Sequence, residues 1–141
     1  MAALSKDVKA YRYELIGRPS VECFTYLDAA FAAQNAAIDQ ALAGRPVSGM
    51  HMAALRAFEK AGVAQYFHLR AGHGIGVVMH DFPDDMAYND RALLERETYA
   101  IEPAIWIQGL GGFRCGDIVA VGARQAEIIT RTPKDRAYIS L

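Results

Sequence analysis

The sequence lacks several features that would point to particular classes of protein. No apolar run approaches the ~20 residues that a membrane span needs, and no apolar signal segment stands at the start. The two cysteines, Cys23 and Cys115, are too far apart for a zinc motif and too few for a disulfide framework. The formal net charge is only −1, from 15 basic and 16 acidic residues, which argues against a nucleic-acid or membrane partner. We therefore expect a reduced, cytoplasmic protein.

The apolar content is high enough for a folded core. Hydrophobic residues make up 52% of the 141 residues, so we expect a single domain over residues 1–141. An alanine-rich helix is predicted over residues 21–43, with Ser20 as a candidate N-cap and an end at Gly44 and Pro46. A second helix is predicted over residues 49–61, and the short connection predicts a helical hairpin. The apolar positions expected to face inward are Phe24, Leu27, Phe31, Ile38, Leu42, Leu55 and Phe58.

The texture of the sequence changes after Gly62. Short β-prone runs then alternate with glycine and proline, which is typical of strands joined by turns. The runs predict strands at residues 66–67, 75–79, 99–101, 105–107, 118–121 and 128–129. Two helices followed by several strands indicate an α+β fold with a curved, mostly antiparallel sheet.

Two histidines stand in unusual local sequences. Glycines flank His73 on both sides within residues 72–76, which predicts either a close approach to a ligand or a glycine-rich strand with a hydrogen-bonded histidine. His80 follows seven residues later and opens the run His-Asp-Phe-Pro at residues 80–83. In a regular strand an odd spacing places two side chains on opposite faces. The two histidines therefore share a pocket only if the chain bends between them.

Two charged segments complete the polar set. Glu102 lies among apolar neighbours before Pro103, and such a carboxylate needs a metal, a cationic group or an arginine unless it is half-exposed on a strand. Arg114 and Asp117 lie in the glycine-rich segment 111–117. They either pair with each other at a hairpin turn or flank a ligand.

The remaining rings and histidines have simpler interpretations. Trp106 and Tyr99 flank Glu102 in sequence, and we interpret them as core or dimer-interface aromatics, with the lining of a substrate pocket as the alternative. His68 is expected at the surface, and His51 is expected to be structural.

Taken in order, the polar segments resemble the pita-bread metallopeptidase family (M24), which includes Xaa-Pro peptidases and creatinase. The Xaa-Pro peptidases carry His-Glu-x-Pro, Glu-Pro-Gly and Gly-Gly-Phe-Arg-x-Glu-Asp, and the similar segments here are residues 80–83, 102–104 and 111–117. The close, residues 129–135, resembles the family's Leu-Thr-x-x-Pro-Arg-Asp-Leu. The resemblance covers roughly residues 11–137 and implies the C-terminal part of a pita-bread fold.

The resemblance also implies roles for individual residues. His73 and Glu102 match two ligands of a pair of divalent ions, which would be manganese, cobalt or zinc. Glu102 also matches the residue that moves the proton, and His80 matches the histidine that contacts substrate and stabilises the tetrahedral intermediate. Arg114 would bind substrate beside them. Carboxylates and one imidazole suit hard divalent ions, and such a pair lowers the pKa of a bridging water.

The ligand set is incomplete by the same comparison. The family site uses two aspartates, one histidine and two glutamates, but the second glutamate falls at Gly116 here. The first aspartate would lie before Met1, and only Glu14 stands near the place of the second. We therefore expect an N-terminally truncated catalytic domain, in which His73 and Glu102 alone remain as ligands.

Three functions stay open from the sequence. The first is an Xaa-Pro peptidase-like hydrolase for small peptides, acting as a homodimer with an incomplete two-metal site. The second is a creatinase-like hydrolase of a C–N bond in a small amide, with no metal and with His73 or His80 as general base. The third is an inactive binding module or a gene fragment.

Overall fold

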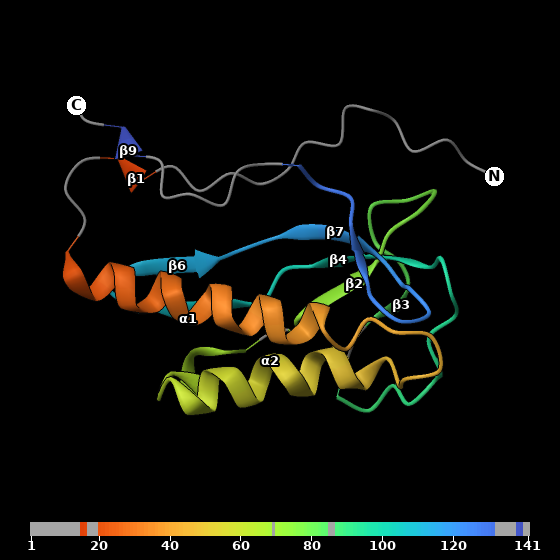
Figure 1. Cartoon of the computed structure of the whole chain (residues 1–141). Coiled ribbons are helices and arrows are strands. Elements are labelled where there is room, and N and C mark those ends of the chain that lie inside the picture. Colours follow the sequence, from red (N-terminus) through yellow and green to blue (C-terminus); the bar gives the residue numbers. More distant parts are fainter. Residues whose placement is uncertain (1–14, 17–19, 69, 85–86, 132–137, 140–141) are drawn as a thin grey trace.

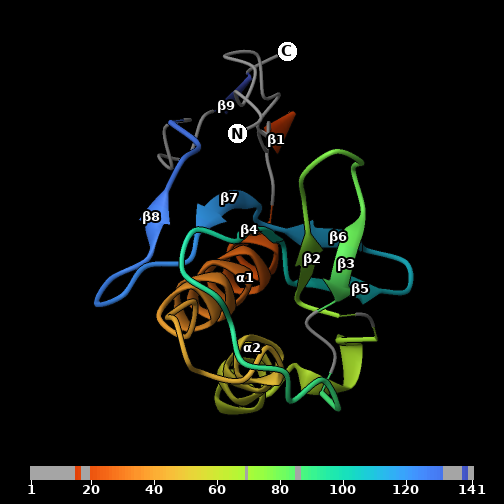
Figure 2. The same ribbon diagram turned by 90° about the vertical axis from the view of Figure 1, so that its right-hand side faces the viewer.

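The protein is a two-layer α+β structure, which confirms the predicted fold class. The computed structural model describes residues 15–16, 20–68, 70–84, 87–131 and 138–139. Two helices lie side by side and cover one face of an antiparallel sheet (Figure 1). The view along the helices shows the same layers, with β3 and β2 on one side of the sheet and β8 on the other (Figure 2).

The helical hairpin consists of α1 (Val21–Ile38) and α2 (Ser48–Lys60). Ser20 caps α1 as predicted, because its side chain accepts a hydrogen bond from the backbone N–H of Cys23. The predicted end of this helix at residue 43 is wrong. Beyond Ile38 the N–H groups of residues 39–42 bond to nearby carbonyls in turns, and then the N–H of Ala43 donates to Gly122 at 2.9 Å and that of Gly44 to Leu93 at 2.9 Å. Turns and tertiary hydrogen bonds therefore replace the last predicted turn of the helix.

Alanines form much of the face that α1 turns toward the sheet. Ala30, Ala33 and Ala37 are fully buried, whereas the predicted Phe24 and Phe31 are only half-buried. Small side chains let the helix approach the strands closely. The core is completed by larger side chains from the strands and α2, among them Phe58, Met50, Tyr99, Ile101 and Ile105.

The main sheet has five strands in the order β3-β2-β4-β7-β8, and every neighbouring pair is antiparallel. A second antiparallel pair joins β5 and β6, and a short parallel pair joins β1 and β9. The bounds are β1 Leu15–Ile16, β2 Gly72–Gly74, β3 Asp81–Asp84, β4 Thr98–Ile101, β5 Ala104–Ile107, β6 Gly111–Arg114, β7 Asp117–Ala120, β8 Glu127–Ile128 and β9 Tyr138–Ile139. Four of the six predicted strands are confirmed, at β4, β5, β7 and β8.

Two predicted strands are wrong for different reasons. Residues 64–66 form a 3₁₀ turn directly after α2, in which the N–H of Tyr66 donates to Val63 at 3.0 Å. Residues 75–80 reverse the chain between β2 and β3, and Val77 there is 92% exposed. An apolar run predicts a strand only if it is buried, and this one is not. The strand that carries the site lies just before it, at β2.

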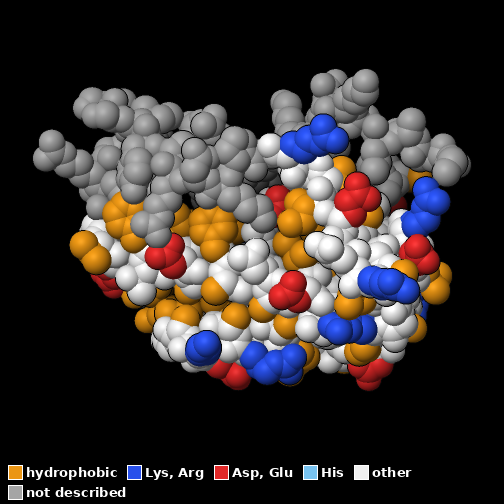
Figure 3. Space-filling model, in the orientation of Figure 1, with side chains coloured by type: hydrophobic (Ala, Val, Ile, Leu, Met, Phe, Trp, Pro, Cys, Tyr) orange, Lys and Arg blue, Asp and Glu red, His pale blue; other side chains and the backbone are white. Residues whose placement is uncertain are grey.

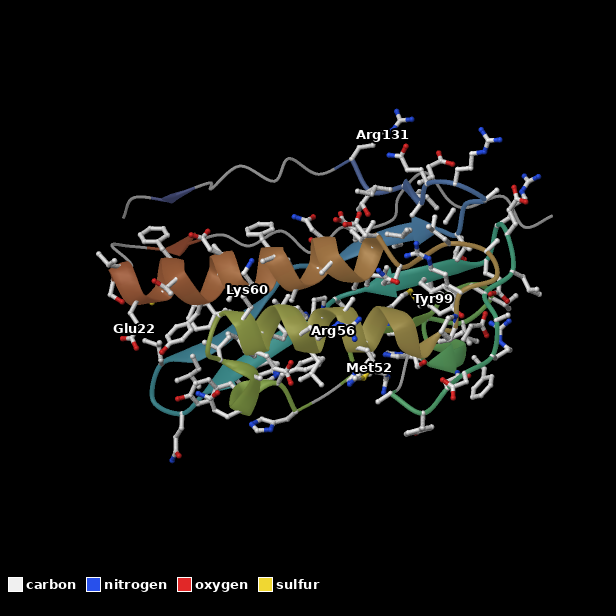
Figure 4. All side chains as sticks on the ribbon, turned by 60° about the horizontal axis from the view of Figure 1, so that its bottom comes forward. Glu22, Met52, Arg56, Lys60, Tyr99 and Arg131 are labelled. Carbon is white, nitrogen blue, oxygen red and sulfur yellow. The ribbon has the colours of Figure 1, made fainter. Side chains whose placement is uncertain are left out.

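The surface shown in Figure 3 mixes acidic and basic side chains without gathering either sign in a patch. The view from below shows Arg56 and Lys60, both exposed, projecting from α2, whereas Tyr99 lies at the sheet (Figure 4). Among the helices that the structure describes, none is long and apolar enough to cross a membrane.

Candidate functional site

His73 is held in the middle of the main sheet by two close backbone approaches. It lies on β2, between β3 and β4, and is only 3% exposed. A Cβ atom at Gly72 would collide with the carbonyl oxygen of Ala100 on β4, and one at Gly74 would lie 2.7 Å from the carbonyl oxygen of Asp81 on β3. The glycines beside His73 therefore let both neighbouring strands approach the histidine strand.

His80 reaches His73 because the chain reverses between β2 and β3. The two ring centroids are 4.0 Å apart with an interplanar angle of 31°. His80 is exposed whereas His73 is buried. The bend required by their odd spacing lies in residues 75–80, where the Asp81 carboxylate accepts a hydrogen bond from the N–H of Val77 at 2.8 Å. A buried imidazole and an exposed imidazole therefore lie next to each other.

Glu102 lies between His73 and Arg114. It follows the last residue of β4, and its carboxylate Oε1 is 3.4 Å from Nε2 of His73. Its other oxygen, Oε2, is 3.4 Å from a guanidinium nitrogen of Arg114 on β6. Arg114, for which the sequence predicted either a pairing with Asp117 or a place beside a ligand, thus contacts Glu102, and Asp117 is buried on β7. Residues from β2, from the end of β4 and from β6, which belongs to the second sheet, therefore meet at one carboxylate.

The His73 ring is oriented by the backbone of the next residue, Gly74. Nδ1 of His73 lies 2.8 Å from the carbonyl oxygen of Gly74, and a carbonyl can only accept, so Nδ1 carries a proton. Nε2 is thereby left facing the Glu102 carboxylate at 3.4 Å. A lone pair and a carboxylate repel each other unless a proton or a cation lies between them. An Nδ1–H bonded to a carbonyl is also the usual support of a metal-binding imidazole.

The described residues do not complete a metal site. Within them, no group of three or more histidine, cysteine, aspartate or glutamate side chains lies close enough to hold an ion. Gly116, where the resemblance places a glutamate ligand, has its Cβ direction 3.5 Å from Cβ of Glu102 and offers no side chain. Arg114 supplies positive charge to Glu102 instead. His73 and Glu102 fit one corner of a metal site, but protein metal sites need at least three ligands.

The aromatic residues near Glu102 have separate positions. Tyr99 is buried in the core, as predicted, and its hydroxyl accepts a hydrogen bond from Arg91 at 3.2 Å. Trp106 on β5 is 49% exposed and lies across from Gly112 of β6, where any Cβ would collide with the indole ring. His68 is exposed, as predicted.

Sequence reasoning did not single out Gln34. It lies on the alanine face of α1 and is 1% exposed, and its side-chain nitrogen donates to the carbonyl oxygen of Ile101 at 3.3 Å. The available signal was the amide itself, since a glutamine between alanines on the buried face of a helix is costly without a partner.

His51 on α2 predicts pH-dependent stability. Its ring stacks on Phe67 with centroids 5.1 Å apart, and burial lowers the pKa of His51 below 6.5. Below about pH 6.5, His51 is protonated in the unfolded chain but stays neutral in the folded chain. The free energy of unfolding should therefore fall as the pH drops from 6.5 toward the lowered pKa of His51. Urea unfolding across this window should show a weaker pH dependence in His51→Phe than in the parent. The same dependence of the unfolding free energy on pH in both proteins would contradict the assignment of this effect to His51.

Comparison with known proteins gives a consistent result. The model of Metallopeptidase family M24 matches residues 10–123. The Xaa-Pro dipeptidase of Lactobacillus helveticus is 37% identical over 109 residues, which cover 77% of this chain and 30% of that protein. The Xaa-Pro dipeptidase of Lactobacillus delbrueckii subsp. lactis is 38% identical over 103 residues, which cover 73% of this chain and 28% of the relative. The chain thus spans less than a third of the length of these relatives.

A solved structure agrees with the sequence relatives. The crystal structure of dipeptidase PepE from Mycobacterium ulcerans matches with a TM-score of 0.84 and 33% sequence identity. The match covers 89% of this chain and 34% of that one. The described helices and sheet therefore correspond to about a third of a larger enzyme structure.

Proposed function

Because the chain belongs to metallopeptidase family M24, we propose that it is an Xaa-Pro peptidase-like hydrolase domain whose two-metal site is incomplete. The observation that carries the proposal is the carboxylate of Glu102, held between His73 and Arg114 at 3.4 Å on each oxygen, with the exposed His80 beside it. Such a cluster offers a proton acceptor and a hydrogen-bond donor within one site.

Each residue has a distinct part in the proposed reaction. Glu102 accepts the proton of the water that attacks the substrate carbonyl, since its carboxylate is only partly buried, at 18% exposure. His80 is exposed and donates a hydrogen bond to the oxygen that becomes negative in the tetrahedral intermediate. His73 and Arg114 hold the carboxylate from both sides, and Arg114 also binds the substrate in the proposed reaction. A bound divalent ion would add a more acidic water, with His73 and Glu102 as its ligands.

The relatives support the class of substrate. Two of them are named Xaa-Pro dipeptidases, so we propose that the substrate is a small peptide with proline after the scissile bond. A cytoplasmic homodimer belongs to the same proposal, as does the assignment of the whole chain to one catalytic domain.

Replacing Glu102 with glutamine should remove most of the hydrolysis. Glutamine has nearly the same shape but cannot accept the proton, so kcat/KM for an Xaa-Pro dipeptide should fall roughly 100-fold or more. His80→Ala should cost a similar factor by removing the donor to the intermediate. The matched control is His68→Ala, which changes an exposed histidine outside the cluster and should leave kcat/KM unchanged. Equal activity of Glu102→Gln and the parent would refute the role of Glu102.

Metal addition separates this proposal from a creatinase-like hydrolase. The peptidase proposal expects that manganese, cobalt or zinc increases Xaa-Pro cleavage and that a chelator abolishes it. The second candidate is favoured by Arg114, which already supplies positive charge to Glu102 at 3.4 Å. It expects hydrolysis of a creatine-type amide that survives chelator and is lost in His73→Ala.

A third result would overturn both enzymatic proposals. Folded protein that hydrolyses neither substrate, with or without added metal, would identify the chain as an inactive module. Circular dichroism of the same samples would show whether the loss of activity reflects unfolding instead.

A further inference from the structure

Gln34 is the one buried residue of the helical layer that reaches the backbone of the site with a polar group, among those that the structure describes. It lies on α1 between fully buried alanines and is 1% exposed. Its side-chain nitrogen donates a hydrogen bond to the carbonyl oxygen of Ile101 at 3.3 Å. The other amide atom, Oε1, is buried and has no hydrogen-bond partner in the described part of the chain.

The peptide unit that Gln34 contacts is the one that leads into Glu102. The carbonyl of Ile101 and the N–H of Glu102 belong to the same planar group. The N–H of Glu102 donates to the carbonyl oxygen of Ala71 at 2.6 Å, just before the strand that carries His73. One side of the plane is therefore bound by helix α1 and the other by the chain entering β2.

A plane that is bound at both ends has little freedom to rotate. Its orientation sets the direction of the Cα–Cβ bond of Glu102, because only two soft dihedral angles per residue lie beyond it. Pro103 follows and restricts Glu102 to extended dihedrals. The position of the carboxylate relative to His73 and Arg114 thus depends on the hydrogen bond from Gln34.

An apolar side chain in place of the Gln34 amide would make the packing of α1 more stable. Burying an amide with only part of its hydrogen bonds satisfied costs free energy, whereas an apolar side chain among Ala30, Ala33 and Ala37 would not. We propose that Gln34 is a positioning residue, which fixes the Ile101–Glu102 peptide plane and through it the carboxylate of Glu102. The proposal deepens the proposed function, since it assigns how the proton acceptor of that site is held.

Hydrogen exchange tests the proposal without any assay of activity. In Gln34→Met, which keeps the length of the side chain but removes both polar atoms, the amide of Glu102 should exchange about tenfold faster. The reference is the amide of Val121, which donates to Glu97 at 2.8 Å at the far end of β4. A merely structural role would accelerate both amides equally, and that result would overturn the proposal.

Two further variants keep the test decisive. Phe58→Leu removes volume from the same core on α2 and should accelerate both amides by the same factor. If Gln34→Met does not fold, Gln34→Asn keeps an amide but withdraws it by one methylene, and the selective effect on Glu102 should persist. Selective exchange in a chain that hydrolyses no peptide would refute the proposed function and leave the positioning role intact. Peptide hydrolysis together with equal acceleration of both amides would refute the positioning role of Gln34 and leave the proposed function intact.

Discussion

Replacing Gly116 with glutamate should give the chain a much tighter site for a divalent cation. An added Cβ atom at Gly116 would lie 3.5 Å from Cβ of Glu102, which is an ordinary contact, so a side chain can start there beside Glu102. The new carboxylate would join Glu102 and His73, which already face each other at 3.4 Å, and would raise the number of ligands to three. Even outer partners of a metal ligand change affinity 10–100-fold, so a third ligand should lower the Kd for manganese or zinc at least about 100-fold.

The Gly116→Glu variant should bind metal more tightly but be less stable without it. Without metal, two neighbouring carboxylates repel each other, so the Gly116→Glu variant should be less stable than the parent to urea and should recover when metal is added. Gly116→Gln has the same size without the charge and should bind metal far more weakly. Isothermal titration of the three proteins decides the matter. Equal affinity of the glutamate variant and the parent would mean that Gly116 does not face the site.

The order of the polar segments predicted more of the site than any one segment did. His73, His80, Glu102 and Arg114 each had a plain structural alternative, yet the structure brings all four together at β2, the turn after it, the end of β4 and β6. The helical hairpin and the α+β class also followed from the sequence, because the apolar period and the glycine stops are local signals. Local signals survive in the fold where tertiary contacts agree with them.

Three features could not be predicted, and two of them involve contacts between distant residues. The helix α1 stops at Ile38, and soon after it Ala43 and Gly44 bond to Gly122 and Leu93, far along the chain. Arg114 turns to Glu102, since β5 and β6 pair and bring its guanidinium to the end of β4. The apolar residues after β2 looked like a strand but form an exposed reversal. Sequence periodicity indicates which secondary structure a residue favours, but it does not indicate which distant residue it will contact.

The largest loss of stability is expected from replacing Gly72 with valine. Any Cβ at this position collides with the backbone carbonyl oxygen of Ala100 and lies 3.2 Å from Cα of Ile101. A backbone atom cannot move aside as a flexible side chain can, so β2 and β4 must separate. Forced separation in a packed core costs about 3 kcal/mol or more. Urea unfolding should therefore show a much lower midpoint, or no cooperative transition at all.

Gly49 offers the matched control, because a Cβ there meets nothing closer than 3.8 Å. It lies in the first turn of α2, where alanine is the better helix former, so Gly49→Ala should be neutral or stabilising by about 0.5 kcal/mol. If both variants lost stability equally, the loss would come from replacing any glycine. The close approach of β2 to β4 would then not be its cause. The expected contrast has a consequence for the site, since His73 lies on β2 and Glu102 directly follows β4. A Gly72→Val protein that still folds should have lost the 3.4 Å contact between them, and with it the hydrolysis proposed for Glu102.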